Sequence, residues 1–128
     1  MSDKVILVTP PDDILVDGLR ILLVDLDQTQ TQMISDVLTS ISNLPTIIGY
    51  VWNETYDVEW LLDKKLKSNL ILFNANSEKD AIIGYMSAQS QAYYFGELKD
   101  LSEVNKSSIR DINELKTLLE TTIKKYGI

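Results

Sequence analysis

The sequence predicts an α/β fold in which a mostly parallel β-sheet lies between two layers of helices. Short and nearly continuous apolar runs, such as residues 20–25 and 70–73, alternate with longer stretches whose apolar residues recur at helical spacing. Continuous apolar runs are typical of parallel strands, because helices cover both of their faces. The length of 128 residues and the 45% hydrophobic content are those of one globular domain. We therefore expect a single domain, residues 1–128, with a three-layer αβα architecture.

The expected strands are short and rich in β-branched or aromatic residues. The first of them is closed by Pro10 and Pro11, which cannot continue a strand ladder. Aspartates and a glycine between residues 12 and 18 are turn signals that separate it from the second strand. The five expected strands are residues 5–8, 20–25, 46–52, 70–73 and 92–95.

The first expected helix begins at Asp27, an N-cap residue type, with Gln30 in the capping-box position three residues later. The second expected helix covers residues 57–67 and ends in the run Lys64-Lys65-Leu66-Lys67. Cations are favourable at a helix carboxyl end, so we expect these lysines to be solvated. Helical spacing predicts that this second helix turns four apolar residues inward, namely Val58, Leu61, Leu62 and Leu66.

Two more helices are expected in the second half of the chain. A capping-box pattern at Ser77 and Asp80 predicts a helix that buries Ala81, Ile82, Tyr85 and Met86. The last helix is expected over residues 109–126. Its predicted inner face is made of Ile109, Ile112, Leu115, Leu118, Leu119 and Ile123.

The composition excludes several classes of function. The chain has no cysteine and no histidine, which rules out disulfides, cysteine or histidine zinc sites, thiol nucleophiles and imidazole bases. Residues 1–63 carry 11 acids and 2 bases, a balance of −9, and residues 64–128 carry 8 acids and 10 bases, a balance of +2. This distribution lacks the basic stripe of a nucleic-acid-binding protein, so we expect no nucleic-acid partner.

The sequence also predicts no association with a membrane. Every apolar run is shorter than the ~20 residues that span a bilayer. The N-terminal residues lack the basic start and cleavage pattern of a secretory signal. We therefore expect a cytoplasmic protein.

Acidic and amide side chains follow the expected strands at their carboxyl ends, where open α/β sheets bind their ligands. Paired carboxylates offer hard oxygen ligands to Mg²⁺, and nearby amides can add oxygens or orient water. This pattern predicts a ligand site with weak Mg²⁺ binding by Asp25 and Asp27 and with no other cofactor. An N-cap role for Asp27 and turn roles for the asparagines are the competing interpretation. The candidate residues are Asp25, Asp27, Asn53, Glu54, Asn74 and Asn76.

The stretch Arg20-Ile-Leu-Leu-Val-Asp-Leu-Asp27 reads as an apolar strand followed by acidic residues and a helix, and the next strands and helix run in order to residue 76. In this pattern, residues 20–76 resemble the first half of a response-regulator receiver domain. The resemblance implies a receiver-like, flavodoxin-like fold. Asn74 stands where the family has its phosphate-accepting aspartate, and an amide cannot form an aspartyl phosphate, so the resemblance implies a pseudo-receiver. Lys99 stands near the place of the family's lysine, but one strand–helix unit of the family is expected to be missing before Lys99, so that role is not carried over.

A second resemblance is to small α/β proteins of T4-like phages, especially those that infect cyanobacteria. The stretches that carry it include residues 17–25, Trp60-Leu-Leu-Asp-Lys-Lys65 and Tyr94-Phe-Gly-Glu97. It implies a viral protein, present in the host cytoplasm or in the virion, and it supplies no catalytic residue.

Three functions remain open from the sequence. The first is a non-enzymatic interaction module that binds a protein partner or itself. If residues 92–95 form an uncovered edge strand, Tyr93, Tyr94 and Phe95 are expected at that interface; the alternative is that the last helix covers them. The second is a small-ligand or nucleotide-binding protein, or an enzyme that uses Asp25, Asp27 and Glu54 as acid and base. The third is a structural component of a virion.

Overall fold

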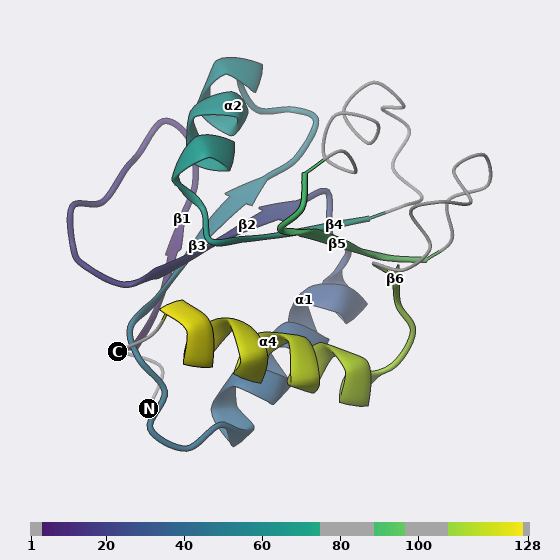
Figure 1. Cartoon of the computed structure of the whole chain (residues 1–128). Coiled ribbons are helices and arrows are strands. Elements are labelled where there is room, and N and C mark those ends of the chain that lie inside the picture. Colours follow the sequence, from purple (N-terminus) through teal and green to yellow (C-terminus); the bar gives the residue numbers. More distant parts are fainter. Residues whose placement is uncertain (1–3, 75–88, 97–107, 127–128) are drawn as a thin grey trace.

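A computed structural model describes residues 4–74, 89–96 and 108–126, and these residues form a parallel β-sheet with helices on both faces (Figure 1). Helices α1 (Gln28–Ser40) and α4 (Ile112–Tyr126) lie against each other on one face. Helix α2 (Val58–Lys67) lies on the opposite face. The predicted three-layer α/β architecture is therefore confirmed. The expected helix after Ser77 lies outside the described residues.

The described sheet has six strands in the order β1-β3-β2-β4-β5-β6, and every pair is parallel. Without β1 the remaining order is that of a flavodoxin-like sheet, 2-1-3-4-5. Four strands of this order, β2 to β5, come before Lys99 in the sequence, and the fifth, β6, comes after it, so all five strands of the order are present. β1 is an addition at the other edge of the described sheet. The strands are β1 Val5–Val8, β2 Leu19–Val24, β3 Ile47–Trp52, β4 Leu70–Asn74, β5 Ala92–Phe95 and β6 Ser108–Ile109.

The direction of each crossover decides which face of the sheet it covers. The chain moves from β2 to β3 in one direction across the sheet and from β3 to β4 in the other, so right-handed crossovers place α1 and α2 on opposite faces. The connection from β1 to β2 moves in the same direction as the one that contains α2. Its residues 9–18 contain no helix, and Ile14 packs into the core on the α2 face. On the α1 face, β1 therefore receives no helix from its own crossover.

Two apolar cores follow from the alternation of side chains along the strands. On the α2 face, Leu22, Ile48, Tyr50 and Trp52 are almost fully buried. On the α1 face, the core is formed by strand residues together with both helices of that layer. It contains Leu19, Ile21, Leu23, Ile47, Leu70, Leu72, Phe95 and Ile109 from the strands, Ile34, Val37 and Leu38 from α1, and Leu115 and Leu119 from α4.

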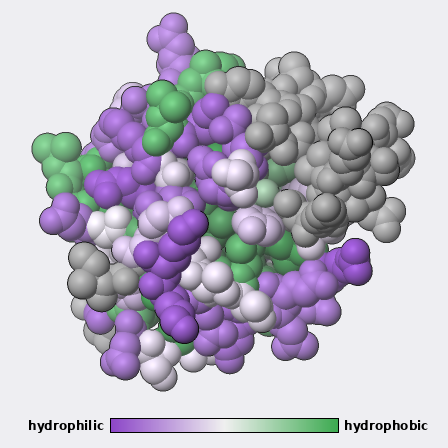
Figure 2. Space-filling view, viewed as in Figure 1, coloured by the Kyte–Doolittle hydropathy of each residue, from purple (hydrophilic) through white to green (hydrophobic). Residues whose placement is uncertain are grey.

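Helix α2 is rotated relative to the sequence prediction. Leu61 is buried as expected, but Trp60, Lys64 and Lys65 are the other buried residues. The cause is Trp60, whose ring packs edge-on against Tyr50 at 5.7 Å and whose Nε1 donates a hydrogen bond to the Asp12 carbonyl at 2.8 Å. The predicted inward positions Val58, Leu62 and Leu66 are instead exposed, and Figure 2 shows hydrophobic side chains at the surface over α2.

The predicted inner face of the last helix is partly wrong. Leu115 and Leu119 are buried at the centre of α4, as expected. Ile109 belongs to β6 rather than to the helix, and Ile112 in the first turn is about half exposed. The difference arises because the helix begins three residues later than the sequence pattern predicted.

The position of β5 excludes one of the two alternatives left open by the sequence, in which residues 92–95 form an uncovered sheet edge. β5 pairs with β4 on one side and with β6 on the other. Tyr94 and Phe95 are buried inside the domain, and Tyr93 is partly buried against the core of the α1 face. The premise of an interface at these three residues is therefore wrong, and the free edge at the opposite side of the described sheet is β1.

Candidate functional site

Asp25 joins the carboxyl ends of β2 and β3. Its backbone N–H donates to the Trp52 carbonyl at 2.9 Å, and its Oδ1 accepts the Glu54 N–H at 3.1 Å. Its φ of 53° lies in the left-handed region, which aspartate tolerates better than most residues. These contacts place the Asp25 carboxylate beside the Glu54 backbone, and a shared ligand site of the two side chains stays a prediction. They also give the Asp25 carboxylate a role in holding the turn.

Asp27 is the N-cap of α1. Its Oδ1 accepts the Gln30 N–H at 2.8 Å, and the Gln30 side chain accepts the Asp27 N–H at 2.9 Å. The predicted capping box is therefore confirmed in both of its hydrogen bonds. The two carboxylates of the acidic pair thus bind backbone groups of different elements.

The asparagines lie at two strand ends. Asn53 follows β3, and its Oδ1 accepts hydrogen bonds from both the backbone N–H and the hydroxyl of Thr55, a turn arrangement. Asn74 ends β4, the neighbour of β2, so Asn74 and Asp25 lie at adjacent strand ends where the sheet order reverses. That position is the usual ligand crevice of such sheets. Asn76 lies outside the described residues.

Magnesium binding at this edge stays a prediction. Among the described residues, no three carboxylates are grouped closely enough to hold a metal ion. A site there would consist of Asp25 and amide or carbonyl oxygens, with water completing the coordination.

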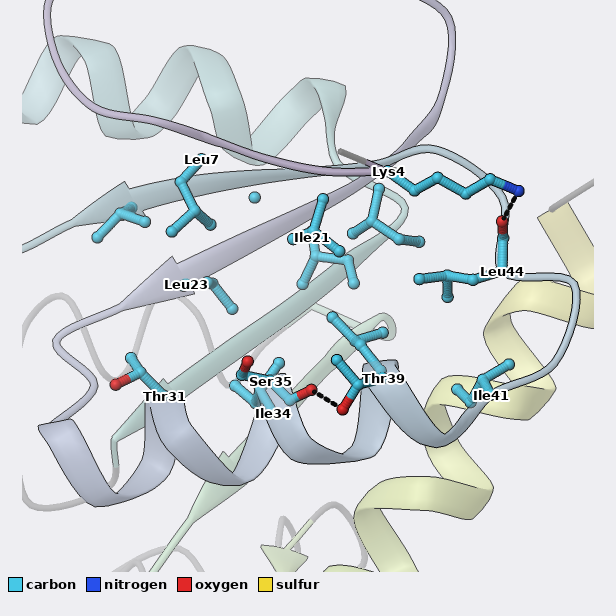
Figure 3. Close-up of a pocket in the computed structure, with 15 residues that line it drawn as sticks. Lys4, Leu7, Ile21, Leu23, Thr31, Ile34, Ser35, Thr39, Ile41 and Leu44 are labelled. Carbon is cyan, nitrogen blue, oxygen red and sulfur yellow. Dashed lines mark hydrogen bonds between the residues drawn. The ribbon is translucent and has the colours of Figure 1, made fainter. Parts of the chain in front are cut away.

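An apolar groove, missed by the sequence analysis, lies between α1 and the β1 side of the sheet (Figure 3). Its volume is about 670 Å³, within the range of roughly 300–1,000 Å³ of small-molecule sites. The groove exists because β1 widens the sheet beyond the width that α1 covers. Its floor is formed by Ile21, Leu23, Ile47, Gly49 and Val51, its walls by Val5, Leu7, Thr31, Ile34, Ser35, Leu38 and Thr39, and one end by Lys4, Ile41 and Leu44.

Gly49 lets the Leu7 side chain approach the floor of the groove closely. A glycine inside a strand weakens the strand, and it often marks a close approach by a ligand or another backbone. A Cβ at this position would lie 2.8 Å from Cδ2 of Leu7, so Leu7 leans over the space above Gly49. The Leu7 side chain is 65% exposed, so it can change rotamer and uncover Gly49. Gly49 within an apolar strand was the signal in the sequence that could have indicated this groove.

Lys4 places a positive charge at one end of the groove. Its Nζ donates to the Leu44 carbonyl at 2.9 Å (Figure 3). The other fourteen of the fifteen lining residues are uncharged, although the whole chain carries −7. The hydroxyls of Thr31 and Thr39 donate to carbonyls of α1 itself, which makes the helix wall less polar than its composition suggests.

A second cluster missed by the sequence analysis consists of two ion-paired carboxylates and two lysines on the α2 face. Lys64 Nζ lies 2.8 Å from an oxygen of Asp13 and 2.8 Å from one of Asp63, and Lys67 Nζ lies 3.1 Å from each. Lys64 also lies over the ring of Tyr50 at 5.4 Å. The expectation that the lysine run is solvated is therefore wrong for Lys64 and Lys65, which are buried.

These contacts shift the ionisation of the cluster. The hydrogen bond from Lys64, opposed by burial, lowers the pKa of Asp13 well below its ordinary range. Hydrogen bonds from Lys64 and then Lys67 lower the pKa of Asp63. Burial opposes the charge of Lys64, but its hydrogen bonds to Asp13 and Asp63 outweigh that effect and raise its pKa. The cluster therefore stays ionised, and it fastens residues 9–18 to α2.

Comparison with known proteins assigns the chain to no family. No protein-family model matches it, and a search of curated proteins found no match. The resemblances to receiver domains and to phage proteins therefore stay predictions. Within the described ranges, none of the helices is long and apolar enough to cross a bilayer.

Proposed function

We propose that this chain is a non-enzymatic interaction module with a receiver-like fold, which binds a protein partner or, as the geometry favours, a second copy of itself. The observation that carries the proposal is the free edge of β1. In the described part of the chain β1 pairs with β3 alone, and an open edge offers unpaired backbone donors and acceptors to another strand.

The side chains of β1 suit a second copy. The strand Val5-Ile6-Leu7-Val8 is apolar on both faces, and Leu7 is largely exposed. A two-fold axis perpendicular to the sheet would pair two β1 strands antiparallel and bring the exposed leucines of both copies together, because such an axis keeps each face of the sheet on the same side. Pro10 and Pro11 limit the pairing to a short strand, so the expected association is weak.

Sedimentation velocity over a concentration series tests this proposal. We expect a reversible monomer–dimer equilibrium that Leu7→Lys abolishes, because two lysines cannot replace the apolar contact at the edge. Leu66→Lys is the matched control, since Leu66 is 81% exposed on α2, on the other face of the sheet. A chain that stays monomeric at every concentration, or that dimerises equally well with Leu7→Lys, contradicts self-association through β1.

The receiver-like part of the proposal makes no use of phosphotransfer. Asn74 lies at the end of β4, in the position where the resemblance places a phosphate-accepting carboxylate. We expect no covalent labelling when the protein is incubated with acetyl phosphate and Mg²⁺, because an amide is not a phosphate acceptor of this kind. A phosphorylated species detected by intact-mass measurement would contradict a non-enzymatic pseudo-receiver.

A further inference from the structure

We infer that the groove between α1 and β1 binds a single-chain amphiphile with an anionic head, of the class of free aliphatic carboxylates. This inference goes beyond the interaction module proposed above and does not depend on it, because the groove is formed within one copy of the chain. It rests on the volume, lining and charge of the groove.

The lining matches an aliphatic chain. Ile21 and Leu23 on the sheet face Ile34 across the gap (Figure 3). Burial of aliphatic carbon against such side chains is favourable for each CH₂ group that leaves water. The volume of about 670 Å³ is that of a small-molecule site, which favours a slender single chain over a folded protein segment.

The charge selects the head group. Lys4 is the one charged lining residue, and it lies at the end of the groove beside Leu44. Its ammonium has three hydrogens, one of which is donated to the Leu44 carbonyl. A carboxylate at this end would pair with Lys4 while its chain extends over Gly49 toward Thr31 at the other end of α1. The net charge of −7 repels an anion elsewhere on the protein, so the ammonium of Lys4 decides at which end of the groove the carboxylate lies.

The flexible parts of the lining would allow entry. Leu7 covers Gly49 from the exposed edge strand, and displacement of its side chain opens the floor. The floor itself belongs to β2 and β3, each of which is paired on both sides and therefore rigid. A ligand can thus enter without any rearrangement of the sheet.

The test is a titration of methyl-labelled protein with dodecanoate, below the concentration at which dodecanoate forms micelles. We expect saturable shifts of the Ile21, Ile34 and Ile47 methyl groups, which line the groove. The methyl groups of Ile48 and Ile71 belong to the opposite core and should not shift. Absence of saturable shifts, or equal shifts on both faces of the sheet, would overturn the inference.

Variants distinguish the residues that bind the aliphatic chain of dodecanoate from the residue that binds its carboxylate. Gly49→Val fills the floor and should abolish saturable binding. Its Cβ displaces the exposed end of the Leu7 side chain, and the higher strand preference of valine should offset that displacement, so the free energy of unfolding should stay close to that of the unmodified protein. Thr39→Phe narrows the groove from the α1 wall and serves as a second blocking variant. Retention of dodecanoate binding by both folded variants would place the ligand elsewhere and overturn the inference.

Lys4→Met should weaken dodecanoate roughly two- to fivefold, the size expected of one exposed ion pair, and should leave dodecanol binding unchanged. Lys116→Met is the matched control, since Lys116 is exposed on α4 and does not line the groove. Equal affinity of the unmodified protein for dodecanol and dodecanoate would refute an anion site. Co-sedimentation with phosphatidylglycerol vesicles would refute a free ligand in favour of a membrane lipid.

Discussion

Lys64 Nζ lies 2.8 Å from Asp13 Oδ2, and this ion pair joins the last turns of α2 to the helix-free connection between β1 and β2. The side chain of Lys64 is almost fully buried, whereas that of Asp13 is 36% exposed. Tyr50, from the middle of β3, adds a hydrogen bond to the same carboxylate at 3.2 Å. The connection contains no helix of its own, and the ion pair therefore attaches it to α2.

Removal of Asp13 should lower the free energy of unfolding more than removal of Lys64 does. Asp13→Ala leaves the buried Lys64 with Asp63 as its remaining carboxylate, and we expect a loss of about 1–3 kcal/mol of unfolding free energy. Lys64→Met should cost less, because its apolar stem is kept and Asp13 retains Lys67 and solvent. Urea unfolding of both variants measures the difference. A larger loss for Lys64→Met would show that the pair itself is strongly stabilising.

The same cluster predicts a loss of stability in acid. The folded-state pKa values of Asp13 and Asp63 lie below their ordinary value of 3.8, so the unfolded state binds protons first as the pH falls. Their contribution is complete above about pH 5 and is lost progressively as the pH falls from there toward the folded-state values. Urea midpoints measured over this range should fall steeply. The double variant Asp13→Asn/Asp63→Asn should show a smaller dependence of the urea midpoint on pH. An unchanged dependence would mean that other carboxylates cause the loss of stability in acid.

The capping role of Asp27 predicts a local stability effect. Asp27→Ala removes the hydrogen bond that the Asp27 side chain accepts from the Gln30 N–H and should cost about 1 kcal/mol. Asp36→Ala, at an exposed position in the middle of α1, is the control and should change stability by less than about 0.5 kcal/mol. Thermal unfolding compares the two. Equal effects would mean that charge, and not capping, explains the loss.

The buried position of Tyr94 predicts that Tyr94→Asp prevents folding. The residue is fully buried between two parallel neighbours of β5, and its ring packs on Phe73 at 5.5 Å. Loss of the ring alone should cost about 3–5 kcal/mol, and an unpaired carboxylate in this position costs more. Circular dichroism measures whether each variant is folded. Tyr126→Asp, at an exposed position of α4, is the control and should fold normally. A folded Tyr94→Asp protein would restore the interface interpretation of this strand.

The fold could be predicted from the sequence where local patterns and tertiary packing agree. Asp27 and Gln30 form the predicted capping box, and the apolar runs at 20–25 and 70–73 form buried parallel strands. The orientation of α2 could not be predicted, because a single tertiary contact of Trp60 overrides the helical spacing of the leucines. β6 has two residues, too few for any periodic signal.

The candidate sites were less accessible to sequence reasoning. The position of Asp25 beside the Glu54 backbone followed from the rule that parallel strands end at one edge. The groove could not be predicted in the same way, since it depends on β1 pairing with β3 instead of β2. The ion pair between Asp13 and Lys64 joins residues about fifty positions apart, and charge patterning along a chain carries no information on such a distance.

Cysteine cross-linking tests the central claim, self-association through β1, most directly. The chain has no native cysteine, so Ile6→Cys and Leu7→Cys each introduce a single thiol at the edge. In an antiparallel pair one β1 residue lies opposite its own copy, with Cα atoms about 4.5–5.5 Å apart, a separation that a disulfide spans. We predict that mild oxidation converts one of these variants to a covalent dimer far faster than Leu66→Cys on α2. Equal rates for all three variants would contradict pairing at β1.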